Sequence, residues 1–248
     1  MRAFHGKEEI KKRYLERVRG HRLNREIIHG YYWADGRGCA VGATIHGRDL
    51  FAYERELGIP ASLAGLKDRI FEGMPNADAV RWPEDFLSAI RPGTDVSNVW
   101  PLFAVWLLEH PADGVVRFAN TKDMRELVTR VASLYRQVCI NASESWLRAE
   151  AHAAAEAAKQ QVNLAKQNGK GGTQVAARLS AAETAEAAAV ALWAPTRWAP
   201  RWIQEVSESA AVTEAIAEGP CWVELAVHAA ENSHIRQSLK LLDLLRAA

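Results

Sequence analysis

"ESWLRAEAHAAAEAAKQQVNLAKQ", residues 144–167, lies in the most alanine-rich part of the chain, where 19 of the 53 residues from 142 to 194 are alanine. Alanine is the strongest helix former, and facing alanines let two helix backbones approach closely. One seam at three- and four-residue steps consists of Leu147, Ala151, Ala154, Ala158, Val162 and Ala165. A second seam begins with Val175, Leu179 and Ala182. The glycine-rich residues 167–173 between them predict a turn, and therefore an antiparallel helical hairpin.

Helical patterns extend over the rest of the chain. The stripe of Ile10, Tyr14 and Val18 predicts an amphipathic helix from about residue 7. Shorter helices, separated by proline and glycine, are expected over 49–57, 60–71, 83–90 and 96–109, and longer ones over 121–139, 143–167, 173–193, 200–217 and 221–246. The fold class is therefore mainly α. An N-terminal region, residues 1–113, and a C-terminal helical bundle, residues 114–248, are expected, either as two domains or as one continuous domain.

The segment 30–47, GYYWADGRGCAVGATIHG, contains five glycines. Asp35 and Gly36 both tolerate positive φ and predict a hairpin turn, with flanking β-strands of a few residues at most. The segment is interpreted either as a tight structural turn or as a reactive centre around Cys39.

The segment suggests two sets of candidate functional residues, one catalytic and one ligand-binding. His21 and Glu26 lie close to Cys39 in sequence and could activate its thiol, which makes Cys39, His21 and Glu26 the candidate catalytic residues. The candidate ligand-binding residues are Trp33, Arg37 and His46. A small cysteine packed against close backbone is the structural alternative, and it is the one that the sequence favours.

Two Glu-x-x-His pairs, Glu26–His29 and Glu231–His234, have the spacing of a di-iron site in a helical bundle. His29 stands directly before Gly30, where a helix ends, and we expect solvated polar residues rather than a metal site. Neither a metal nor a cofactor is expected. The other cysteines, Cys139 and Cys221, are expected in the core.

Composition and charge limit the possible partners. The 248 residues carry a formal net charge of +1, but residues 1–25 hold nine Lys and Arg against three Glu. We expect a solvated or salt-bridged helix face there, with an anionic partner as the alternative, and no nucleic-acid binding.

The sequence predicts a soluble, cytoplasmic protein. The three cysteines are widely spaced, no apolar signal segment is present, and the apolar run 101–108 is too short to cross a membrane.

The segment 193–202, WAPTRWAPRW, places Trp198 and Trp202 one helical turn apart. We expect this aromatic stripe to pack in the core, with binding of a partner as the alternative.

The chain contains no nucleophile elbow, HExxH, dinucleotide-binding pattern or nucleic-acid module. The sequence therefore favours a non-enzymatic accessory or interaction protein with a protein partner or self-association. The alternative is a small-molecule enzyme or ligand-binding protein that uses the Cys, His and Glu residues of the N-terminal segment.

Two stretches of the chain resemble a protein family. They are residues 4–47, FHGKEEIKKRYLERVRGHRLNREIIHGYYWADGRGCAVGATIHG, and residues 56–73, ELGIPASLAGLKDRIFEG. The family is one of uncharacterised bacterial and phage-associated proteins. The resemblance covers about the first 110 residues closely, and it implies an alanine-rich helical region that ends in a leucine-rich helix, like SLKLLDLLRAA at 238–248. It implies an architecture and a bacterial or phage setting, with bacterial conflict as one such setting, but no activity. Ala43 stands where relatives often have a second cysteine.

Overall fold

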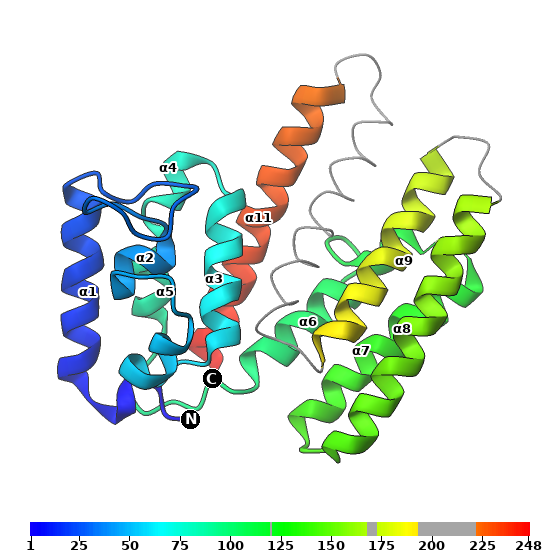
Figure 1. The fold of residues 1–248 in the computed structure, drawn as a ribbon, viewed down its shortest axis with the longest axis horizontal. Coiled ribbons are helices and arrows are strands. Elements are labelled where there is room, and N and C mark those ends of the chain that lie inside the picture. Colours follow the sequence, from blue (N-terminus) through cyan, green and yellow to red (C-terminus); the bar gives the residue numbers. More distant parts are fainter. Residues whose placement is uncertain (120, 168–172, 193–221) are drawn as a thin grey trace. The chain divides into compact units, whose positions relative to one another are not determined.

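The fold is mainly helical, as the sequence predicts. The computed structural model describes residues 1–119, 121–167, 173–192 and 222–248 (Figure 1). Within those ranges every regular element is a helix, and the only β pairings are isolated bridges. In the same ranges no helix is long and apolar enough to cross a membrane.

The chain forms two compact units that differ from the predicted division at residues 113 and 114. Unit 1 comprises residues 1–100 together with 234–248, and unit 2 comprises residues 101–233. The last fifteen residues belong to unit 1 because they pack there: the ring of His234 lies so close to Gly73 that a Cβ on this glycine would be 2.3 Å from it. Residues 101–113 belong to unit 2, where Glu109 pairs with Arg136.

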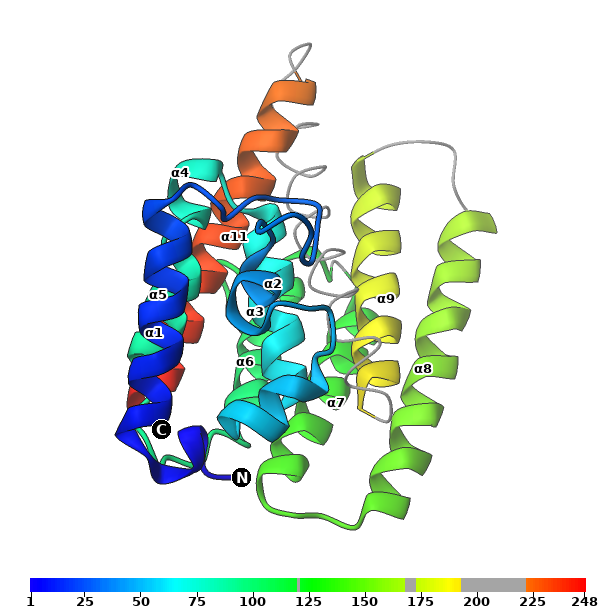
Figure 2. The same ribbon diagram turned by 60° about the vertical axis from the view of Figure 1, so that its left-hand side comes forward.

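Unit 1 is built from short helices, whose bounds are η1 (Ala3–Gly6), α1 (Glu8–Leu23), α2 (Ala40–Ile45), η2 (Tyr53–Leu57), α3 (Ala61–Gly73), α4 (Asn76–Ala79), α5 (Trp82–Ala89) and the part of α11 (Trp222–Ala247) that begins at His234. Figure 2 shows α2 between α1 and α3, and the contacts place α1 and α3 against both α2 and α5. α1 continues through Gly20 and buries the predicted stripe, with Tyr14 and Val18 at most 1% exposed. The central position of the short helix α2 buries residues 38–44 of the glycine-rich segment within this unit, whereas residues 30–37 lie largely at its surface.

Unit 2 contains the alanine-rich hairpin. Its elements are α6 (Val99–Glu109), which begins two residues before the unit does, η3 (Val115–Phe118), α7 (Lys122–Cys139), α8 (Glu144–Gln167) and α9 (Thr173–Ala191). α8 and α9 lie antiparallel along their length (Figure 1), and Ala151, Ala154 and Ala158 of the predicted seam are fully buried. Tyr135 of α7 donates a hydrogen bond to the Ala188 carbonyl, at 2.7 Å. The predicted hairpin is therefore confirmed.

Some sequence predictions differ from the structure or lie outside the described residues. Cys139 is partly exposed rather than in the core, because α7 ends at this residue. The predicted helix over 200–217, the Trp198 and Trp202 stripe and Cys221 lie outside the described residues. The turn predicted within 167–173 lies mostly outside them as well.

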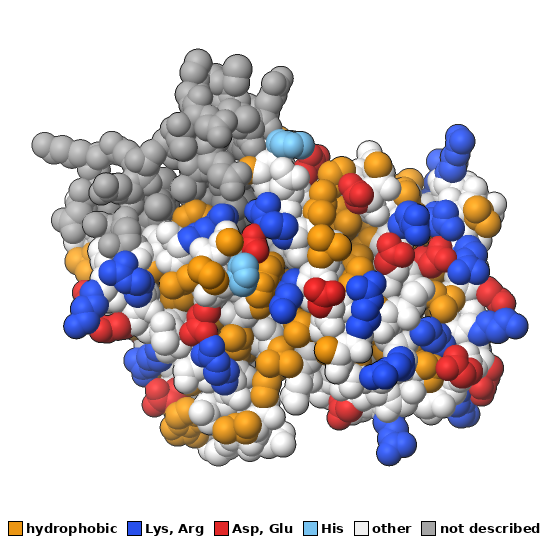
Figure 3. Space-filling view, turned by 180° about the vertical axis from the view of Figure 1, so that it is seen from behind, with side chains coloured by type: hydrophobic (Ala, Val, Ile, Leu, Met, Phe, Trp, Pro, Cys, Tyr) orange, Lys and Arg blue, Asp and Glu red, His pale blue; other side chains and the backbone are white. Residues whose placement is uncertain are grey.

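Several side chains of the basic N-terminal segment form ion pairs or hydrogen bonds with the rest of unit 1. Glu84 of α5 accepts from both Arg19, at 2.7 Å, and Arg22, at 3.0 Å. Lys11 donates to the carbonyls of Ile90 and Ser88. These ion pairs agree with the predicted salt-bridged helix face. Basic and acidic side chains also lie interspersed over the face of the molecule seen in Figure 3.

Candidate functional site

The glycine-rich segment begins with a two-residue turn. Asp35 (φ 49°) and Gly36 (φ 77°) both have positive φ, and Ala34 and Arg37 exchange two backbone hydrogen bonds of 2.9 Å. These features define the predicted hairpin turn. In place of strands, the structure has this single pair and a bridge between Ile27 and Gly38.

Two glycines are required by a close approach of the backbone. A Cβ on Gly38 would lie 2.0 Å from the Tyr32 carbonyl oxygen, and one on Gly42 would lie 1.2 Å from the same atom. Neither distance is compatible with a side chain, so only glycine lets the Tyr32–Trp33 peptide pack on the first turn of α2. The glycine pattern of this segment therefore has a structural cause.

Cys39 lies beneath this peptide as the N-cap residue of α2. Its Sγ accepts from the Gly42 N–H at 3.5 Å, and its thiol points to the Tyr32 carbonyl at 3.9 Å. The residue is 1% exposed. Burial raises the pKa of the Cys39 thiol, and the negative charge of Asp68 raises it further. This environment keeps the proton on sulfur and fits the structural interpretation.

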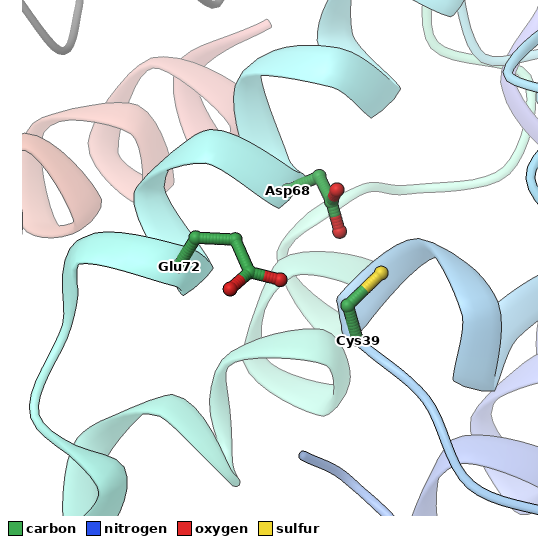
Figure 4. A group of neighbouring side chains, drawn as sticks. All are labelled: Cys39, Asp68 and Glu72. Carbon is green, nitrogen blue, oxygen red and sulfur yellow. The ribbon is translucent and has the colours of Figure 1, made fainter. Parts of the chain in front are cut away.

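We call Cys39, Asp68 and Glu72 the thiol–carboxylate cluster. Figure 4 shows the two carboxylates, from α3, turned toward the Cys39 sulfur, and the ligand atoms of all three residues lie within 4.8 Å of one another. Asp68 accepts from the Val41 N–H at 3.1 Å, and Glu72 accepts from the Gly30 N–H at 3.0 Å. Burial raises the pKa of both carboxyl groups. The three atoms are near enough to share a cation, but each carboxylate already holds a segment of backbone in place.

A lysine that the sequence analysis did not single out lies in the core of unit 1. Lys67 is fully buried, and its ammonium donates to the Ala40 carbonyl (2.9 Å), the Thr44 hydroxyl (2.8 Å) and the Tyr53 hydroxyl (2.7 Å). Burial lowers the pKa of Lys67 to about 7. A signal was available, since Lys67 stands four residues after Leu63 and three before Ile70, on the buried stripe of α3.

We call His21, Glu26, Trp33 and His46 the imidazole cluster. Nδ1 of His21 lies 2.6 Å from a Glu26 carboxylate oxygen, and its Nε2 lies 2.8 Å from Nε2 of His46. The Trp33 indole stacks on the His46 ring at 4.4 Å between centroids, and it meets the His21 ring edge-on at 5.0 Å. A carboxylate, two imidazoles and an indole therefore form one connected group.

Local structure positions each member of this cluster. His21 lies in the last turn of α1, and the turn that follows returns the chain so that the Glu26 N–H donates to the His21 carbonyl at 2.9 Å. His46 ends α2 in the left-handed conformation, with φ 54°. Trp33 belongs to the peptide that packs on Gly42. Nearby, Arg17 donates to the Thr44 carbonyl at 2.8 Å.

The charges in the cluster affect one another. The hydrogen bond from His21 lowers the pKa of Glu26, and Arg37 lowers it further through its positive charge. Burial lowers the pKa of His46, and the charge of Arg17 acts in the same direction. The arrangement favours an ionised Glu26 next to two imidazoles, in which both ring nitrogens of His21 and Nε2 of His46 contact other members of the cluster.

The structure separates the predicted catalytic residues into two groups. His21 and Glu26 join the imidazole cluster, together with the predicted ligand-binding residues Trp33 and His46, and Arg37 is near enough to act on Glu26. Cys39 instead has its contacts with Tyr32, Gly42 and Asp68.

The Glu-x-x-His spacing does not create a site at Glu26 and His29. His29 bonds the Phe71 carbonyl at 3.0 Å, while Glu26 bonds His21. The segment that carries them is not helical, so the pair does not have the geometry of a di-iron ligand pair.

Unit 2 has a groove of its own between α7 and α8, with a volume of about 590 Å³. Trp146 and Arg125 lie along it, and Arg130 is paired with Glu150 across it at 2.8 Å. The lining mixes charges of both signs, so it indicates no particular ligand.

Comparison with protein families, with curated proteins and with solved structures finds no match to this chain.

Proposed function

We propose that this protein binds a small ligand through the imidazole cluster of unit 1. The observation that carries the proposal is the convergence of Glu26, His21, His46 and Trp33, joined by contacts of 2.6 and 2.8 Å and by ring stacking at 4.4 Å. The two histidines are 25 residues apart in the chain, and only the packing of α1 against α2 brings them together.

The exposure of the cluster supports binding rather than a purely structural role. The Glu26 side chain is 29% exposed and the His21 side chain 15%, and His46 lies at the surface. The cluster is therefore partly open to solvent, and the Trp33 indole supplies an apolar surface within it. An apolar surface with a few convergent polar groups is typical of a small-molecule site. An oriented carboxylate–imidazole pair also suits proton transfer to a bound ligand.

The test is a ligand screen on the chelator-treated full chain by saturation-transfer NMR, using small carboxylates, phosphates and nucleosides. Compounds that bind the native protein are expected to lose binding in Trp33→Ala and His46→Ala. They should keep it in His228→Ala, which removes a histidine whose side chain is 74% exposed on α11. Hits that bind all three variants equally would contradict the proposal.

A second candidate function is docking of a protein partner or self-association, and one observation favours it. Tyr31 and Tyr32 are 65% and 44% exposed, on the same loop that carries Trp33. Exposed tyrosines are enriched at protein interfaces, because the ring supplies contact area and the hydroxyl a hydrogen bond. Sedimentation velocity of the native chain and of Tyr31→Ser/Tyr32→Ser tests self-association. Identical monomeric behaviour of both would rule it out.

We propose that the protein acts in the reducing cytoplasm of a bacterial cell, as a bacterial or a phage-encoded protein. The three cysteines are far apart in the chain, and Cys39 and Cys139 are free thiols, as is usual in a reducing compartment.

A further inference from the structure

The two histidines of the imidazole cluster face each other through the same atom. The Nε2 atoms of His21 and His46 are 2.8 Å apart, so a single proton lies between them. A carboxylate can only accept, so the contact of 2.6 Å with Glu26 places a proton on Nδ1 of His21. The Nε2 lone pair of a neutral His21 is then directed at His46. The Nε2 atoms of His21 and His46 therefore share one electron-pair acceptor that lies between them, which in the metal-free protein is a proton.

We propose that this acceptor is a divalent first-row transition-metal ion, such as Zn²⁺, Ni²⁺ or Cu²⁺, bound by Nε2 of His21 and Nε2 of His46. The inference rests on the proposed function and names the ligand class of that site. Imidazole is a preferred ligand of these ions. The metal takes the place of the shared proton, and this proton moves through solvent to Nδ1 of His46, so that each neutral ring then carries its one proton on the nitrogen that does not bind the metal.

The distance between the nitrogens fits this exchange. On a tetrahedral ion with bonds of about 2.05 Å, two imidazole nitrogens lie about 3.3 Å apart, so the rings need to separate by roughly 0.5 Å and to turn until both Nε2 lone pairs point at the ion. The His46 side chain is at the surface and follows the end of α2, where such a movement is small compared with a rotamer change.

The surroundings hold the ligands as they are held in metal sites. Metal-bound histidines usually donate their second ring N–H to a carboxylate or carbonyl, which fixes the tautomer and raises the basicity of the ligating nitrogen. Glu26 provides this contact for His21. Trp33 restrains both rings, with centroids at 4.4 Å from His46 and 5.0 Å from His21.

The site is an open one. Two protein ligands leave coordination positions for water or for an anionic ligand, unlike a closed structural zinc site with four protein ligands. Arg17 acts against the cation, since its charge reaches His46, and Glu26 acts in its favour. We therefore expect binding that is reversible and that is sensitive to each of these side chains.

Calorimetric titration of the chelator-treated full chain with ZnCl₂ and NiCl₂ tests the inference. One ion per chain is expected, with affinity at least tenfold lower in His21→Ala and in His46→Ala and unchanged in His228→Ala. Glu26→Gln keeps both imidazoles and should weaken binding by roughly 10- to 100-fold. Equal affinity in the native chain and in the double variant His21→Ala/His46→Ala would overturn the assignment, as would an absence of binding.

Electron paramagnetic resonance of the Cu²⁺-loaded chain counts the nitrogens directly. The spectrum should show two imidazole nitrogens in the native protein and in Glu26→Gln, and one in either single histidine variant. A spectrum that is unchanged in those variants would overturn the inference. If the native chain binds no metal but the NMR hits depend on Trp33 and His46, the metal assignment fails while the proposed function stands. If neither metal nor organic compounds depend on the cluster, both fail.

Discussion

The imidazole cluster and the thiol–carboxylate cluster flank the same short helix, yet they have opposite environments. The imidazole cluster reaches solvent, with 29% of the Glu26 side chain exposed, and its polar atoms contact one another. Cys39 is buried under the Tyr32 carbonyl, and the carboxylates beside it hold backbone N–H groups. Reactive residue types therefore hold backbone in place in the buried cluster, whereas in the partly exposed cluster they contact one another near the surface, where we propose that a ligand binds.

The largest effect is expected from a substitution of Gly42, in the helix α2 that both clusters flank. Gly42→Ala would place a Cβ 1.2 Å from the Tyr32 carbonyl oxygen and must displace the loop that covers Cys39 and carries Trp33. We expect a loss of about 3 kcal/mol or more in the free energy of unfolding, measured in urea. Gly20→Ala is the control, because a Cβ there meets nothing within 4 Å, and it should stabilise helix α1 by about 0.5–1 kcal/mol. Equal stability of the two variants would show that the loop does not pack on α2 as described.

The second-largest effect concerns the pH dependence of stability, through the buried side chain of Lys67. Burial lowers the pKa of Lys67 to about 7, whereas in an unfolded chain it is about 10.4. Between these values the unfolded chain binds one more proton, so this group makes stability rise with pH from about 7 to 10 and adds no pH dependence below that window. Relative to Lys67→Met, the native chain should gain on the order of 3 kcal/mol across it.

Urea midpoints at a series of pH values between 6 and 10 measure this gain. Lys12→Met, at a side chain that is 76% exposed, is the control and should keep the native slope. The same slope in Lys67→Met would contradict burial of the lysine in its neutral form.

The reactivity of Cys39 sharpens the contrast between the clusters. Its raised pKa and its burial predict alkylation by iodoacetamide at least about tenfold slower than that of the partly exposed Cys139 at pH 7.5. His21→Ala should leave the Cys39 rate unchanged, because its contacts are with Tyr32, Gly42 and Asp68. Peptide mass spectrometry gives both rates. Fast labelling of Cys39 at pH 6 that depends on His21 would restore the catalytic interpretation.

The smallest effect is electrostatic and concerns the exposed cluster alone. Arg17→Gln removes a positive charge that acts on His46, and with it the hydrogen bond to the Thr44 carbonyl. Zinc affinity should rise by about two- to fivefold, equivalent to about 0.5–1 kcal/mol for an exposed charge interaction. Arg13→Gln, an exposed residue that also lies over the Tyr14 ring, is the control and should leave the affinity unchanged. A lower affinity in Arg17→Gln would contradict the described role of this charge.

The candidate site was only partly predictable. His21, Glu26, Trp33 and His46 could be named because they lie in or shortly before a glycine-rich segment of unusual composition, and the structure brings these four together. Their separation from Cys39 was not predictable, since sequence proximity does not determine at which end of a short helix each side chain lies. Asp68 and Glu72 were missed because they lie about 30 residues after Cys39 in the sequence and belong to no motif, although the fold brings them close to it.

The sequence by itself determined the local structure of this protein. Alanine content and the spacing of Ala151, Ala154 and Ala158 are enough to specify the helical hairpin, and Asp35–Gly36 specifies the tight turn of the glycine-rich segment, because these preferences act within a few residues. Only the tertiary structure decided that 234–248 return to unit 1 and that His21 meets His46. Those contacts join segments far apart in the chain, and they form when apolar faces are buried together, which no local preference encodes.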